Sequence, residues 1–84
     1  MNELQKLPNI GPKIAEQLNA AGMFTYADLV SVGSEEAWLR IKAIDPSACF
    51  NRLMSLEGAI AQLRWHDLPE AEKVRLRAFY QAHK

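Results

Sequence analysis

The residues best suited to chemistry lie in one short segment near the start of the chain, Leu7-Pro8-Asn9-Ile10-Gly11-Pro12-Lys13. Pro12 fits the first turn of a helix, because its missing N–H loses no hydrogen bond there. The start of such a helix presents unpaired amides and the positive end of the helix dipole, which favour an anion. A phosphate would sit near the N–H of Gly11 and the ammonium of Lys13. The chemistry predicted for this segment is therefore anion binding.

The same segment resembles the helix-hairpin-helix motif of DNA-binding and repair proteins, through the arrangement Leu-Pro-x-Ile-Gly-Pro-Lys-x-Ala-x-x-Leu over residues 7–18. Asn9 stands where that motif usually has a second glycine, and Asn tolerates left-handed backbone angles better than most residues. The resemblance implies contacts with the DNA backbone, and the candidate residues are Asn9, Ile10, Gly11 and Lys13. The alternative is a turn that only packs two helices together, with Lys13 as a solvated side chain.

A second group of versatile side chains, Arg64-Trp65-His66-Asp67, interrupts the helical pattern later in the chain. Exposed Trp residues often anchor protein partners, so Trp65 and His66 are candidates for a protein-interaction surface. The alternative is that Trp65 closes a small core.

The elements that must position these residues are all helical. No stretch shows the sustained apolar-polar alternation of a strand, so the sequence predicts an all-α, compact bundle of five or six short helices with an N-terminal helix-hairpin-helix-like unit. The predicted helices lie at residues 2–6, from Pro12 to Gly22, from Tyr26 to Val32, from Ser34 onward, after Asp45-Pro46, and from Leu68-Pro69-Glu70 onward.

Helix starts are predicted from capping residues. Thr25 and Asp28 have the spacing of a capping box, Ser34 is a natural N-cap, and Asp45 with Pro46 suits an N-cap followed by the first helical residue. The helix after Pro46 carries the clearest apolar stripe, formed by Cys49, Leu53, Leu56, Ile60 and Leu63. Cys49 is therefore expected in the core. Gly58 inside this helix predicts close approach by another segment.

Length and composition predict one domain over residues 1–84. The single Cys49 excludes an internal disulfide, and the spacing of a zinc site is absent, so no metal or cofactor is expected. No signal peptide or membrane-spanning run is present, which predicts a cytoplasmic protein with no membrane contact. No catalytic constellation appears, so we expect no enzyme. Ten basic and ten acidic residues cancel, and any DNA contact must be local.

Beyond the hairpin, the chain resembles the C-terminal domain of TfoX/Sxy proteins in four stretches: Leu7 to Gly22, Gly33 to Ile41, Leu56 to Ile60 and Arg64 to Pro69. That family regulates natural competence for DNA uptake in bacteria, and its two-domain members add an N-terminal α/β domain. The resemblance implies a non-catalytic regulatory or adaptor domain for competence and transcription control, with weak non-specific DNA binding through the hairpin. The alternative is a protein-interaction module without nucleic-acid contact, whose partner is an N-terminal TfoX-type domain, a second copy or the transcription machinery. The sequence fits a stand-alone protein and a fragment of a two-domain regulator equally.

Overall fold

The computed structural model describes residues 3–83 of the chain. These residues fold into five α-helices and two 3₁₀ helices with no strand, which confirms the predicted all-α class. In chain order the elements are η1 (Glu3–Lys6), α1 (Pro12–Ala20), α2 (Tyr26–Val32), α3 (Ser34–Ile44), α4 (Phe50–Ala61), η2 (Trp65–Asp67) and α5 (Glu70–His83). The predicted first helix is a single 3₁₀ turn from Glu3, and residue 2 lies outside the described residues.

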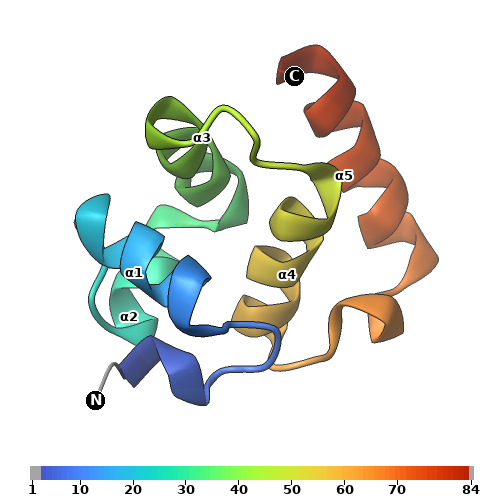
Figure 1. The fold of residues 1–84 in the computed structure, drawn as a ribbon. Helices are drawn as coiled ribbons and strands as arrows, with labels where there is room; N and C mark the ends of the chain where they lie inside the picture. The colour runs from blue at the N-terminus through green and yellow to red at the C-terminus, as the bar shows by residue number, and fades with distance from the viewer. Residues whose placement is uncertain (1–2, 84) are drawn as a thin grey trace.

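Helix α4 is the central element of the fold. It contacts α2, α3, α5 and η2, and it lies between α5 on one side and α1 and α3 on the other (Figure 1). Leu53, Leu56 and Ala59 on this helix are fully buried. The rest of the core comes from η1, the other α-helices and two of the linking segments, and includes Leu4, Leu18, Met23, Leu29, Trp38, Ile41, Leu68 and Leu76. Surface residues on α4 are therefore positioned by a helix that is anchored in the core.

Trp38 on α3 contacts the start of α4 and one face of α5. Its side chain is fully buried, and its indole N–H donates to the Cys49 carbonyl at 3.1 Å. The rings of Phe79 and Tyr80 on α5 meet it edge-on, with centroids 6.1 and 5.6 Å away. Aromatic pairs prefer such geometry, so α5 is fixed in position by this cluster.

The predicted capping box at the start of α2 is confirmed. The Thr25 hydroxyl accepts from the Asp28 N–H at 3.0 Å, and the Asp28 carboxylate accepts from the N–H groups of Thr25 and Phe24 at 3.2 and 2.9 Å. The Phe24 and Thr25 bonds hold the pKa of Asp28 below its ordinary value.

The start of α3 differs from the prediction. Gly33 is the N-cap, with φ at 88°, and Ser34 is the first helical residue. The Ser34 side chain is 4% exposed and donates to the Glu57 carboxylate on α4 at 2.6 Å. The Ser34 hydroxyl, which the sequence suggested as a local helix cap, is therefore bonded to Glu57 on another helix instead.

The prediction that Asp45 and Pro46 start a helix is wrong, because α4 begins four residues later at Phe50 with Cys49 as its N-cap. The Asp45 carboxylate accepts from Ser47, Gln17 and Arg52 instead, at 2.5, 2.8 and 2.9 Å. These bonds to α1 and α4 favour a linking loop over a new helix turn.

Two members of the predicted apolar stripe lie outside the core. Cys49 is exposed, not buried as predicted, because it precedes the helix whose periodicity the prediction had extended to it. Leu63 lies beyond the other end of α4 and is 39% exposed. The stripe is therefore real only within Phe50–Ala61.

Candidate binding surface at the hairpin

The turn between η1 and α1 is built on buried apolar side chains. Leu4 and Ile10 are 0% and 5% exposed, and the N–H groups of Leu7 and Ile10 donate to the carbonyls of Leu4 and Leu7 at 3.1 and 3.3 Å. Asn9 has φ at 68°, the left-handed geometry that the sequence required of it. The Ile10 side chain therefore packs into the core beneath the turn, and only the backbone of Ile10 is available near the surface.

The Asn9 side chain is turned inward and fastens the hairpin to a distant part of the chain. Its amide group donates to the carbonyls of Leu63 at 2.9 Å and Ser55 at 3.4 Å, and its oxygen accepts from the Trp65 N–H at 3.1 Å. Both ends of the amide are thus used within the fold. We refer to these three bonds as the Asn9 staple.

Gly58 makes room for the Asn9 staple. A Cβ atom at this position would lie 2.5 Å from the Asn9 amide nitrogen and 2.7 Å from the Leu63 carbonyl oxygen. Both separations are below van der Waals contact, so a side chain here would push the hairpin away from α4. The close approach predicted from Gly58 is confirmed, and the hairpin is what approaches.

The start of α1 is open to solvent. Gly11 is the N-cap with no side chain capping the helix, and Gly11, Pro12 and Lys13 are all exposed. A Cβ atom at Gly11 would meet nothing within 4 Å, and the first turn of α1 carries no acidic residue. Unpaired amides at such a site favour an anion, and a carboxylate that would compete for them is missing from this turn.

The Asn9 staple brings the two candidate groups together. Trp65 follows the hairpin in sequence by more than 50 residues, yet its N–H is bonded to Asn9. The Trp65 ring is half-buried and meets the exposed His66 ring edge-on, with centroids 5.0 Å apart. The hairpin and η2 therefore form one continuous region, which we call the hairpin surface.

Two cations that were not among the candidate site residues, Arg64 and Lys73, lie at or beside η2. Arg64 is exposed and lies between Leu63 and Trp65, two of the three residues that the Asn9 staple holds. The Lys73 ammonium donates to the His66 carbonyl at 3.1 Å and so lies beside η2. The run Arg64 to Asp67 was visible in the sequence, but only the fold shows that it adjoins the hairpin.

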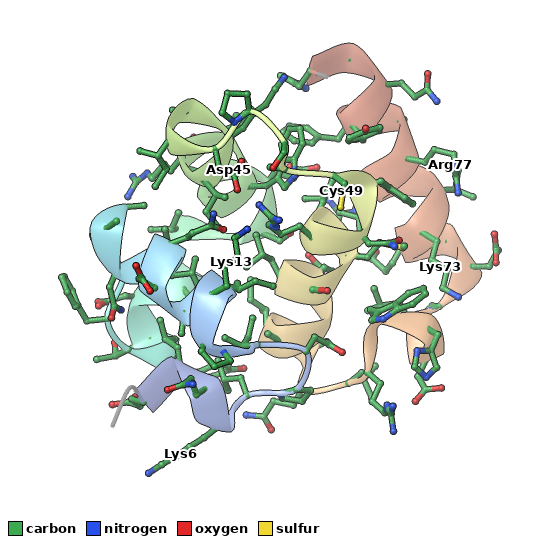
Figure 2. All side chains as sticks on the ribbon, in the orientation of Figure 1. Lys6, Lys13, Asp45, Cys49, Lys73 and Arg77 are labelled. Atoms are coloured by element: carbon green, nitrogen blue, oxygen red, sulfur yellow. The ribbon has the colours of Figure 1, made fainter. Side chains whose placement is uncertain are left out.

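The remaining charges define the extent of this surface. Lys13 and Arg64 make no ion pair within residues 3–83, whereas Arg75 is paired with three carboxylates on the other side of α4. Lys6 extends away from the domain and does not point toward Lys13 (Figure 2). Asp67 is also exposed on η2 and reduces the local excess of positive charge. The surface is therefore only modestly cationic.

Other classes of site have little support in the described part of the chain. Residues 3–83 contain no group of three or more His, Cys, Asp or Glu side chains that could hold a metal ion. The same residues contain no helix that is long and apolar enough to cross a membrane.

Comparisons with known proteins agree with this geometry. The family model described as the TfoX C-terminal domain matches residues 1–80. The triclinic crystal structure of an uncharacterized protein from Listeria monocytogenes is 47% identical, with a TM-score of 0.92 over 94% of this chain and 90% of that chain. A tetragonal crystal structure of a protein of unknown function from the same organism is 46% identical, with a TM-score of 0.93 over 96% of this chain and 99% of that one. No curated protein sequence matches the chain.

The family match extends over nearly the whole chain and includes both the hairpin and η2. It confirms the resemblance found in the sequence. The chain belongs to the TfoX C-terminal domain family.

Proposed function

We propose that this chain is a non-catalytic binding domain of a competence regulator, and that its hairpin surface holds the phosphate backbone of DNA weakly and without sequence preference. The observation that carries the proposal is the open, uncapped start of α1, where exposed Gly11 and Lys13 stand next to the Asn9 staple. Unpaired helix amides and an unpaired ammonium are the groups that proteins use to bind phosphate.

The charges set the strength of this binding. Lys13 at the start of α1, with Arg64 and Lys73 at or beside η2, can neutralise few phosphates; Lys13 and Lys73 lie on opposite sides of α4 (Figure 2), and the chain as a whole has no net charge. Binding of this kind has a dissociation constant on the order of 10⁻⁴ to 10⁻⁶ M at physiological salt. With about three phosphates contacted, the logarithm of the affinity should fall with the logarithm of salt concentration at a slope of about −2 to −3.

Lys13→Glu tests the proposal through the fluorescence anisotropy of a labelled DNA duplex. We expect the variant to bind about tenfold more weakly at low salt, because a cation beside the phosphate is replaced by an anion. Lys6→Glu is the matched control, since it makes the same change in net charge on a side chain that points away from Lys13 (Figure 2). Equal losses in the two variants would show that only net charge matters and would refute the hairpin site.

The second candidate function is a protein-interaction module, with Trp65 and His66 at the contact. It is favoured by the apolar character of one edge of the hairpin surface, where the half-buried Trp65 adjoins Leu63, which is 39% exposed. Such an edge suits an N-terminal TfoX-type domain or a component of the transcription machinery. Titrating the labelled domain with a separately produced N-terminal TfoX-type domain tests this candidate. Signal shifts at Leu63 and Trp65 that Leu63→Asp abolishes would support it, and an unchanged spectrum would exclude that partner.

A further inference from the structure

A groove of about 410 Å³ lies on a different part of the molecule, between the end of α2, the start of α3 and the faces of α4 and α5. Val32, Leu39 and Phe79 give it apolar walls, and its charged lining is Glu35, Glu36, Glu57 and Arg75. The volume is within the range of about 300 to 1,000 Å³ that is typical of ligand-binding pockets. We call it the Arg75 groove. Glu57 is next to Gly58 in α4, and successive helical residues point about 100° apart, so the groove and the hairpin use different faces of this helix.

The Arg75 groove carries more acid than base. The Arg75 guanidinium lies 2.9 Å from Glu35, 3.3 Å from Glu57 and 2.8 Å from Glu72, so one cation serves three carboxylates. Glu36, also in the lining, is already paired with Arg40 at 3.1 Å. Two negative charges around Arg75 therefore remain uncompensated.

The carboxylates also keep hydrogen-bonding capacity. Glu35 and Glu57 each use one oxygen for Arg75, and Ser34 donates to the same Glu57 oxygen. Within residues 3–83 the other oxygen of each carboxylate accepts no hydrogen bond. The groove thus offers two acceptor oxygens next to apolar walls. A ligand that matches it would carry a cationic hydrogen-bond donor on an apolar stem.

An arginine side chain has this chemistry. Its guanidinium has five N–H donors in a plane, so it can donate to more than one acceptor, it is weakly hydrated, and its methylene stem packs on apolar surface. Phe79 offers an aromatic ring, on which guanidinium groups also bind favourably. Lysine would match the charge, but its ammonium is more strongly hydrated and lacks the planar face that stacks on an aromatic ring. DNA is excluded by the negative charge of the site.

We propose that the Arg75 groove is a docking site for a protein partner that inserts an arginine flanked by an apolar residue. The excess negative charge selects the guanidinium, and the walls formed by Val32, Leu39 and Phe79 take its stem and its apolar neighbour. This proposal does not depend on DNA binding at the hairpin surface.

The probe is the peptide acetyl-Leu-Arg-amide, added to the isotope-labelled full chain and followed by NMR. The control peptide carries citrulline, which has the shape of arginine without its charge. We expect the amide signals of Gly33, Ser34 and Leu39 to shift with the arginine peptide, and the citrulline peptide to bind about tenfold more weakly, because charged hydrogen bonds are lost.

Glu35→Gln should weaken binding of the arginine peptide, because the groove loses one negative charge. Glu35 is partly exposed, so the substitution leaves the core intact. Glu70→Gln, an exposed carboxylate outside the groove lining, is the control and should bind as the unchanged chain does. Equal binding of the two peptides would overturn the proposal. So would spermidine shifting the same signals as strongly as the arginine peptide, because the groove would then attract any cation and would not recognise a side chain.

Discussion

At the scale of single residues, Asn9 is the side chain that links the hairpin to the second half of the chain. A left-handed position that a glycine would fill more easily is occupied by asparagine, which tolerates this geometry well and also supplies both a donor and an acceptor. Its three bonds connect the turn to segments that follow it by 46 to 56 residues. Asn9 therefore shapes the candidate surface without itself being available to a ligand.

Asn9→Ala should destabilise the domain by about 2 to 4 kcal/mol, because the Leu63 carbonyl and the Trp65 N–H lose their partner and alanine is strained at positive φ. Urea unfolding measures the change. Asn9→Gly avoids the strain of alanine but does not restore the hydrogen bonds, so it should be more stable than Asn9→Ala and less stable than the unchanged chain. Asn51→Ala, at an exposed position on α4, is the control and should change the free energy of unfolding by less than about 0.5 kcal/mol. Equal effects at positions 9 and 51 would contradict the role of the staple.

Gly58→Ala tests the same contact from the other side. Alanine normally stabilises a helix interior by about 1 kcal/mol relative to glycine, but here its Cβ would overlap Asn9 and the Leu63 carbonyl. The overlap should reverse the sign and destabilise the domain by about 1 to 3 kcal/mol in urea unfolding. Gly11→Ala, where a Cβ meets open space, is the comparison, and it should cost less than about 1 kcal/mol, because only the preference for glycine over alanine at an N-cap is lost. A stabilised Gly58→Ala variant would show that the hairpin is not held close to α4.

At the scale of the elements, the loop between α3 and α4 is stabilised by a carboxylate. Hydrogen bonds from the side chains of Ser47, Gln17 and Arg52, in that order of importance, hold the pKa of Asp45 well below its ordinary value of 3.8. The folded state therefore keeps Asp45 ionised at pH values where the unfolded chain takes up a proton. The stability that Asp45 contributes is present above about pH 4 and is lost progressively as the pH falls below that value.

Asp45→Asn should lower the urea midpoint at pH 7 and flatten the loss of stability between about pH 4 and pH 2. The physical reason is that asparagine keeps the shape but neither the charge for Arg52 nor the proton linkage. Urea midpoints measured across this pH range test it, with Asp67→Asn on exposed η2 as the control. An identical pH dependence in Asp45→Asn and the unchanged chain would rule out Asp45 as a source of acid sensitivity.

The helices themselves were predictable where local chemistry decides them. The capping box at Thr25, the start of α1 at Pro12 and the apolar spacing of Leu53 and Leu56 each follow from short-range rules. The errors at Ser34 and Asp45 have one cause, because each side chain that could cap a helix locally has a partner on another helix, and sequence periodicity contains no information about such partners. The error at Cys49 is different: the apolar spacing was extended to a residue that precedes α4.

At the scale of the whole molecule, the arrangement of charge matters more than its sum. The chain is neutral, yet Arg64 and Lys73 lie at or beside η2 and Lys13 lies at the start of α1, on the other side of α4 from Lys73 (Figure 2), while the Arg75 groove is acidic. The sequence located the hairpin and the Arg64 to Asp67 run separately. That they adjoin depends on the Asn9 staple, a contact too distant in sequence to be foreseen.

An NMR titration of the labelled domain with a short DNA duplex tests most directly whether the open start of α1 holds a phosphate. At low salt the amide signals of Gly11 and Lys13 should shift first, with Arg64 next, and the shifts should fade as salt is raised. The signals of Gly33 and Leu39 in the Arg75 groove should stay in place. Absence of movement at Gly11 and Lys13 at low salt, or equal movement in the groove, would contradict the account.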